Sequence, residues 1–360
     1  MASGAKQLQT ILQPEWWHAP QITRTIMHFW ATSSLPNPNK LHDISCLGTE
    51  HADSCGILQR IPAAFLTSRQ VWAGAVRAGQ TGVRQMQETK VQETKQTGGF
   101  LTISGARLDY RLVGPHPADA PTIVMLHEGL GSLTQWGDMP EKLVAATGAG
   151  VLAYSRQGYG QSSPVALPRP LDYLDREALD VLPQVLDAVG VRRGVLFGHS
   201  DGATIAAIHA ARVQDPRITG ISMVAPHFFV EEIAVAAIAE AKAAYDAGEL
   251  KRRLARHHAD VEGAFRGWND TWLDPRFRVW NIIPLLRDIQ VPVQVMQGET
   301  DQYATLQQVH VVGTHCRGPV DMVVMPGVGH SPHREAPDLT LQKLVEFCGR
   351  TLNVQGSSAC

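Results

Sequence analysis

Short apolar runs alternate with longer helical patterns along the chain from about residue 100 onward. The runs are bounded by glycine and polar residues, which is typical of buried strands, whereas the segments between them repeat apolar residues with the helical period. Strands are predicted at residues 100–104, 107–113, 122–126, 150–154, 194–197, 220–224, 291–296 and 320–325. Helices are predicted at residues 141–146, 172–189, 201–213, 305–312 and 337–352. This alternation predicts an α/β domain with a mostly parallel sheet between helices, opened by an antiparallel strand pair.

One interval breaks the alternation, because residues 226–284 contain no convincing strand. Three helical patterns fill it, at residues 231–247, 249–258 and 261–273. A helical insertion at this point of an α/β domain is expected to lie over the ends of the strands. We therefore predict a cap at residues 226–284, inserted into a core formed by residues 96–225 and 285–355.

The first 95 residues have a different pattern from the rest of the chain. Prolines interrupt them, apolar residues keep no steady period, and acidic residues are sparse before Glu88. We predict a poorly ordered N-terminal extension. A start codon assigned too far upstream, with Met86 as the true start, is the interpretation that we favour, while a native or targeting leader remains open.

The composition excludes several classes of function. Hydrophobic residues make up 44% of the chain and the formal net charge is −2, so the chain can build a large core but offers no basic surface for nucleic acid. The five cysteines are scattered and form no C-x-x-C pair, which favours a reducing compartment over a zinc site. No window is apolar enough to span a membrane. We expect a soluble cytoplasmic protein that acts on a small molecule without metal or organic cofactor, in an oligomeric state that the sequence leaves open.

The strongest local motif is GHSDG at residues 198–202, which follows an apolar run and opens a helical pattern. This is G-x-S-x-G in the context of a strand, a sharp turn and a helix. Such a turn projects the serine oxygen away from the sheet, and glycines on both sides remove side chains that would collide there. The motif therefore predicts that Ser200 is a nucleophile.

A serine hydroxyl needs a base, and the base needs a group that fixes its tautomer. Two later strands are followed by suitable side chains, Asp301 and His330, at the edge of the sheet where such folds place their site. Glu299 competes with Asp301 for the acidic role, and His333 follows His330 closely. The order Ser, Asp, His along the chain favours Ser200, Asp301 and His330 as a catalytic triad.

Backbone N–H groups are the expected source of an oxyanion hole. The motif HEGLGS at residues 127–132 follows the buried strand at residues 122–126. We expect one donor from Gly129 in this loop and the other from Asp201, the residue after the nucleophile.

Taken together, these motifs resemble the α/β-hydrolase superfamily over about residues 100–352. The resemblance rests on HEGLG at residues 127–131, SRQGYG at residues 155–160, GHSDG at residues 198–202, Asp301, and GH at residues 329–330. It implies an eight-stranded sheet, a substrate pocket under the cap, and cofactor-free hydrolysis through an acyl-enzyme. Glu128 and Asp201 depart from the usual pattern, since glycine and an apolar residue are common at these positions.

We predict a carboxylesterase acting on a small or medium apolar ester. A carbon–carbon bond hydrolase of ring-cleavage products and a non-catalytic ligand-binding relative are the alternatives. We place at the pocket Glu128, Leu130, His199, Trp268 and Trp272. The tryptophans could equally be core residues, and Asp201 could simply be a favourable charge in the first turn of its helix. The sharper hypothesis is that Glu128 and Asp201 add negative potential beside His330 and disfavour anionic substrates.

Overall fold

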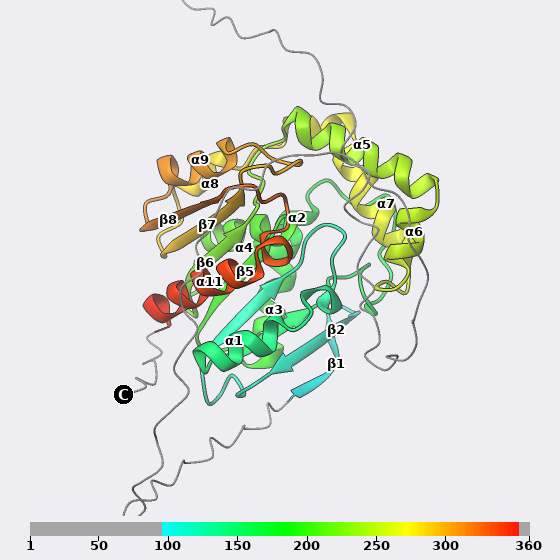
Figure 1. The fold of residues 1–360 in the computed structure, drawn as a ribbon. Helices are drawn as coiled ribbons and strands as arrows, with labels where there is room; N and C mark the ends of the chain where they lie inside the picture. The colour runs from blue at the N-terminus through cyan, green and yellow to red at the C-terminus, as the bar shows by residue number, and fades with distance from the viewer. Residues whose placement is uncertain (1–95, 353–360) are drawn as a thin grey trace, which may run out of the picture. The chain divides into compact units, whose positions relative to one another are not determined.

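A single sheet forms the centre of the structure, a computed structural model that describes residues 96–352. Within these residues its strand order is β1-β2-β4-β3-β5-β6-β7-β8 (Figure 1). β1 pairs with β2, and β2 with β4, in antiparallel fashion, whereas all later neighbours are parallel. The strands are β1 (Gln96–Ile103), β2 (Ala106–Val113), β3 (Thr122–Leu126), β4 (Gly150–Tyr154), β5 (Gly194–His199), β6 (Ile218–Val224), β7 (Val293–Gly298) and β8 (Val320–Met325). The predicted eight-stranded, mostly parallel sheet is confirmed; the predictions for residues 1–95, including Met86, lie outside the described residues.

Helices connect the parallel strands. They are α1 (Met139–Thr147), α2 (Tyr173–Arg176), α3 (Leu182–Val189), α4 (Asp201–Arg212), α5 (Glu232–Asp246), α6 (Glu249–Leu254), α7 (Val261–Trp272), α8 (Ile283–Leu286), α9 (Gln307–His315), α10 (Pro332–Glu335) and α11 (Pro337–Thr351). Two short 3-10 helices, η1 (Leu133–Trp136) and η3 (Pro275–Val279), complete the set together with the π-helical turn η2 (Glu177–Val181).

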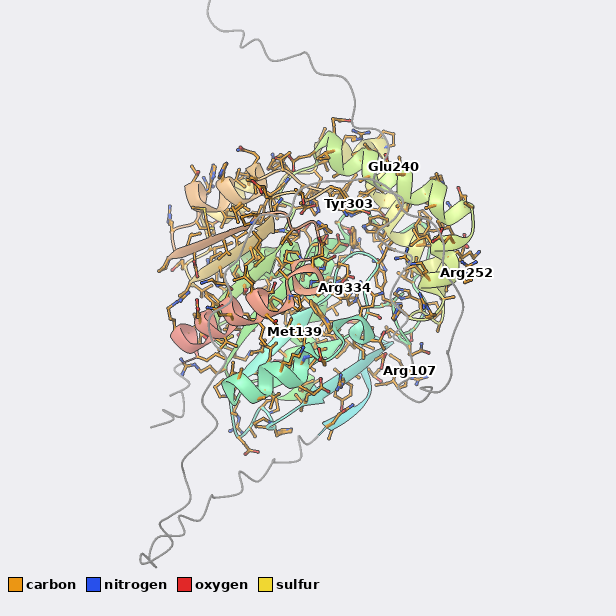
Figure 2. All side chains as sticks on the ribbon, in the orientation of Figure 1. Arg107, Met139, Glu240, Arg252, Tyr303 and Arg334 are labelled. Atoms are coloured by element: carbon orange, nitrogen blue, oxygen red, sulfur yellow. The ribbon has the colours of Figure 1, made fainter. Side chains whose placement is uncertain are left out.

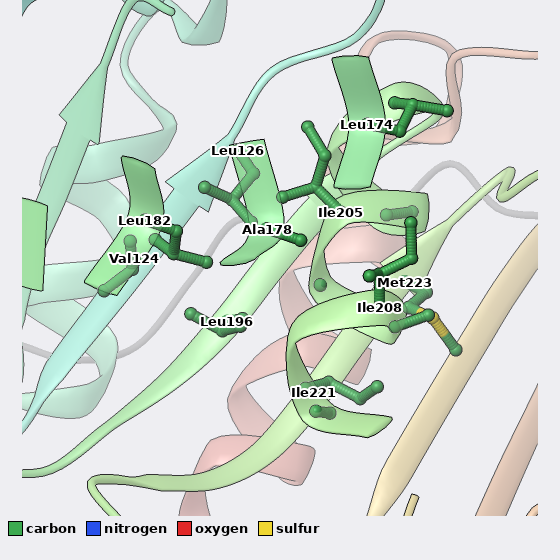
Figure 3. Close-up of a cluster of buried hydrophobic side chains, with 14 of the residues drawn as sticks. Val124, Leu126, Leu174, Ala178, Leu182, Leu196, Ile205, Ile208, Ile221 and Met223 are labelled. Atoms are coloured by element: carbon green, nitrogen blue, oxygen red, sulfur yellow. The ribbon is translucent and has the colours of Figure 1, made fainter. Parts of the chain in front are cut away.

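The central strands are buried on both faces, which is why they are continuous apolar runs rather than alternating ones. Successive side chains of a strand point to opposite faces. Val124 and Leu126 of β3 therefore join the cluster under α2, α3 and α4 (Figure 3), while Ile123 and Met125 join a second cluster under α1 and α11. Helices thus cover both faces, and the loops at the strand ends are left free to form a site.

The long helix that we predicted at residues 172–189 is interrupted. The structure divides it into α2, the π-helical turn η2 and α3. Pro183 lies in the first turn of α3 and has no N–H to donate to the preceding turn, so the α-helical ladder cannot run through this point. The apolar period alone did not reveal this break.

An insertion of helices separates β6 from β7. It consists of α5, α6, α7 and η3. The helices α5, α6 and α7 lie together beside the sheet in Figure 1. Its two ends lie side by side, because Phe229 pairs with Asn281 and the Ile282 N–H donates to the Phe228 carbonyl at 2.7 Å. Residues that leave the sheet thus return to it at almost the same place.

Candidate active site

Ser200 lies on the sharp turn between β5 and α4. Its backbone has φ +52° and ψ −116°, which is strained for a residue with a side chain. The neighbouring glycines permit the turn: a Cβ on Gly198 would lie 2.3 Å from the Gly202 carbonyl oxygen, and a Cβ on Gly202 would lie 2.0 Å from the Leu126 carbonyl oxygen. Only glycine fits at either position, as the G-x-S-x-G motif predicted.

His330 and Asp301 are in direct contact. Nδ1 of His330 lies 2.9 Å from each carboxylate oxygen of Asp301. Burial tends to raise the pKa of Asp301, but the His330 ring and the Tyr303 N–H, which donates to Oδ1 at 2.8 Å, leave that pKa below its usual value. Glu299, the competing acid, is exposed and lies near the Gly327 N–H instead.

The loops after β7 and β8 hold this pair in place. The Thr300 N–H donates to the Val328 carbonyl at 2.9 Å, which joins the two loops. Glu335 of α10 accepts from the N–H of Gly329 at 2.7 Å and from that of Ser331 at 3.0 Å. The turn that carries His330 is therefore fastened on both sides of the histidine.

His199, the residue before the nucleophile, contacts His330 and so links the turn of Ser200 to the turn of His330. The Nε2 atom of His199 lies 2.8 Å from the His330 carbonyl oxygen, and the two rings are 5.1 Å apart. Among the described residues, Ser200 Oγ makes no hydrogen bond to the His330 ring. Catalytic hydrogen bonds are often long without substrate and tighten only in the complex.

The N–H groups of the two expected oxyanion donors have no hydrogen-bond acceptor in the part of the chain that the structure describes. Asp201 is the first residue of α4, so its N–H has no partner within the helix. Hydrogen bonds within residues 96–352 also leave the Gly129 N–H unused. The loop that carries Gly129 is held by Arg156, whose guanidinium donates to the carbonyls of His127 and Glu128, and whose N–H donates to His127 Nε2 at 3.0 Å.

The side chain of Asp201 belongs to a buried polar network. Tyr173 donates its hydroxyl to Asp201 Oδ2 at 2.6 Å and accepts from Trp272 Nε1 at 3.0 Å. The Arg156 guanidinium lies 3.8 Å from the same carboxylate oxygen. Burial nevertheless raises the pKa of Asp201 above its usual value. This network connects the insertion, through Trp272, to the residue that follows the nucleophile.

Glu128 lies beside a histidine and an arginine. Its carboxylate lies 3.5 Å from His199 Nδ1 and 3.6 Å from the Arg334 guanidinium, and these groups hold its pKa well below the usual range despite burial. Asp201 lies beside Arg156 in the same way. Both carboxylates that we expected to add negative potential beside His330 therefore have a nearby positive charge that offsets their field. His199 is only 1% exposed, so its ring packs in the interior beside these groups.

The insertion contacts the loops at the carboxyl ends of the strands. The Trp268 ring lies so close to Gly129 that a Cβ there would be 2.3 Å from it. His258 accepts from the Gly160 N–H through Nδ1 and donates to the Leu130 carbonyl through Nε2, each at 3.0 Å. The expected pocket residues Leu130, Trp268 and Trp272 thus lie where the insertion meets the core.

Two further side chains flank His330, and we did not predict them from the sequence. The ring of Tyr303 lies 4.7 Å from His330, and that of His227 lies 5.7 Å from it. Burial and the charges of Asp301 and of Glu240, a residue of α5 near Tyr303 in Figure 2, raise the pKa of Tyr303 to about 12. Their positions directly after β7 and β6 were the available signal, because side chains there converge on one edge of the sheet.

Within 96–352, no group of three or more His, Cys, Asp or Glu side chains is arranged to hold a metal ion. In the same part of the chain, no helix combines the length and apolar character that a membrane span requires.

The comparisons with known proteins agree with this architecture. The chain belongs to the alpha/beta hydrolase family, whose model matches residues 123–343. It is similar to a hydrolase from Pseudomonas aeruginosa PA01, with 23% identity, a TM-score of 0.57, and coverage of 70% of this chain and 98% of that one. No curated protein matches the sequence.

Two other solved structures have the same fold. The enol-lactonase from Burkholderia xenovorans LB400 is 24% identical, with a TM-score of 0.56 over 70% of this chain and all (100%) of that one. Naproxen esterase from Bacillus subtilis is 18% identical, with a TM-score of 0.55 over 71% of this chain and 92% of that one. At these identities the likeness concerns the fold.

Proposed function

We propose that the protein is a serine hydrolase that cleaves carboxylic esters of small or medium apolar acyl groups, with Ser200, His330 and Asp301 as its catalytic triad. The contact of both Asp301 oxygens with His330 Nδ1 carries this proposal. A carboxylate at Nδ1 keeps the proton there and leaves Nε2 unprotonated, which is the tautomer that a general base needs. The strained turn at Ser200 supports it.

In the first step, Ser200 Oγ attacks the ester carbonyl carbon and its proton passes to His330 Nε2. The N–H groups of Gly129 and Asp201 stabilise the tetrahedral oxyanion. The C–O bond to the alcohol then breaks as His330 returns the proton to the leaving oxygen, which leaves an acyl-enzyme. A water molecule, deprotonated by His330, hydrolyses that intermediate in the same way. The lowered pKa of Asp301 keeps its carboxylate charged beside the imidazolium throughout.

The insertion at residues 226–284 acts as a cap over this site in our proposal. Its Trp268 ring against Gly129, and Leu130 beside it, would line the pocket for the acyl group. Glu128, His199 and Trp272 would act by holding the loops that face the substrate. The words esterase and enol-lactonase in the names of two similar structures agree with an ester as the substrate class.

A panel of p-nitrophenyl esters with acyl chains of two to twelve carbons tests the proposal. We expect turnover that is fastest at short or medium chains, and a fall of at least about 1,000-fold in kcat for Ser200→Ala. Labelling of the wild-type protein, but not of this variant, by a fluorophosphonate probe is the accompanying control. A wild-type protein that neither reacts with the probe nor hydrolyses any ester would contradict the proposal.

A further inference from the structure

His227 is a buried histidine whose ring has no hydrogen-bond partner among the described residues. It is 3% exposed, and its Nδ1 atom is buried without a partner. The hydrogen bonds of this residue within 96–352 are made by its backbone, whose carbonyl accepts from the Thr204 hydroxyl at 2.7 Å and whose N–H donates to the same oxygen at 3.3 Å. A buried polar group left unpaired costs about 1–3 kcal/mol, so its retention calls for an explanation.

The ring of His227 lies at the proposed site. It is 5.1 Å from the Trp272 ring in an edge-on arrangement and 5.7 Å from the His330 ring. Thr204, in the helix that follows the nucleophile, fixes the backbone of His227 on both sides and so limits where the ring can turn. The unpaired nitrogens are therefore held close to the reacting groups.

Two other histidines of the site have partners at both ring nitrogens, whereas the buried Nδ1 atoms of His199 and His333 have no hydrogen-bond partner among the described residues. His127 accepts from the Arg156 N–H at Nε2 and donates to the Glu128 carbonyl at Nδ1, and His258 is bonded at both nitrogens. Burial and the neighbouring His330 lower the pKa of His227 to about 3. At neutral pH its ring is thus uncharged and offers one N–H donor and one acceptor.

We infer that His227 binds a hydroxyl group on the acyl chain of the substrate, close to the reacting carbonyl, as in a 3-hydroxyacyl ester. A hydroxyl can accept from or donate to a neutral imidazole, so it pairs with either tautomer. The deep position of His227 suits the acyl group, which stays bound to Ser200 after the first step, rather than the alcohol, which has to leave. The inference rests on the proposed ester hydrolysis and names the substrate class for it.

The test compares p-nitrophenyl 3-hydroxybutanoate with p-nitrophenyl butanoate. We expect the wild-type protein to have the higher kcat/KM on the hydroxylated ester, and His227→Phe to reduce this ratio about tenfold while butanoate turnover changes little. Phe keeps the ring packing on Trp272. His227→Gln, which keeps a donor and an acceptor, is expected to retain more of the preference than Phe, and it serves as the second variant if His227→Phe fails to fold.

His333→Phe is the matched control. His333 also has a buried Nδ1 without a partner, but its ring packs on Trp136 and His199 and makes no ring contact with His330. The substrate ratio of this variant is expected to equal that of the wild type. A comparable loss in both variants would overturn the inference, because it would reveal a general disturbance of the histidine cluster.

Three other outcomes would also overturn it. The first is a wild-type protein that hydrolyses both esters equally well. The second is a ratio that His227→Phe leaves unchanged. The third is a preference for glycerol 1-butanoate over propyl butanoate that is lost in His227→Phe while the acyl preference persists, which would assign the hydroxyl to the alcohol. Ester hydrolysis continues in all three cases, so they differ from a failure of the proposed function, in which the wild-type protein hydrolyses neither ester.

Discussion

Asp301 and Asp201 are two buried aspartates at the same edge of the sheet, and their surroundings differ. Both oxygens of Asp301 meet the His330 ring, which lowers the pKa of the carboxyl group. Asp201 accepts a hydrogen bond from a neutral hydroxyl at Oδ2 and has none at Oδ1 within residues 96–352, and burial raises its pKa. Nearness to the nucleophile along the chain therefore does not decide which carboxylate can serve the base. The partner that the fold brings to each carboxylate decides it.

The largest effect is expected for Asp301→Asn. An amide at this position no longer favours the proton on Nδ1 of His330, so kcat for p-nitrophenyl butanoate should fall about 10,000-fold. Glu299→Gln is the matched control, because Glu299 follows the same strand but does not contact His330, and it should keep nearly full activity. Equal losses in the two variants would remove the distinction between the two acids.

A smaller effect is expected for Tyr173→Phe. The change removes the hydroxyl that donates to Asp201 and accepts from Trp272, so a buried acceptor and a buried donor both lose their partner. The free energy of unfolding, measured by urea denaturation, should fall by about 1–3 kcal/mol. Tyr110→Phe serves as the control, because no hydrogen bond of its hydroxyl is found in residues 96–352. A Tyr173 variant as stable as this control would show that the network around Asp201 contributes little.

The smallest effect is the pH dependence of stability. The lowered pKa of Asp301 contributes stability that is present above its unfolded value of 3.8 and is lost as pH falls through the folded value. The raised pKa of Asp201 has the opposite sign, because its stabilising contribution is present at low pH and is lost as pH rises through the folded value. Between about pH 3 and pH 6, the free energy of unfolding of the wild type should therefore rise relative to that of Asp301→Asn. Over the same range it should fall relative to that of Asp201→Asn. Parallel curves for the two variants would contradict this assignment.

The parts of the site that were predictable from the sequence depend on local pattern. The motif GHSDG predicts its turn because the strand, the glycines and the helix follow one another along the chain. The alternation of strands and helices predicts the sheet. The sequence favoured Asp301 but kept Glu299 as a competitor, since both follow the same strand. Only the loop conformation, in which the Asp301 side chain turns to His330, separates them.

The parts that were not predictable depend on distant partners. Tyr173 meets Asp201 across 28 residues, and one sequence contains no signal for which buried hydroxyl will meet which carboxylate. The position of His227 directly after β6 was visible in the sequence, but the absence of a partner for its ring was not. Pairing of this kind is set by packing in three dimensions rather than by local propensity.

The close approach of Trp268 to Gly129 restricts how this protein can diverge. Any side chain added at position 129 would meet the indole, and a bulkier or differently angled group at position 268 would press on the loop backbone. A residue larger than glycine at position 129 would therefore require a smaller side chain at position 268. A related protein with different helices between β6 and β7 would need a different loop at position 129 as well. Related proteins that differ in this insertion should therefore also differ at both positions 129 and 268.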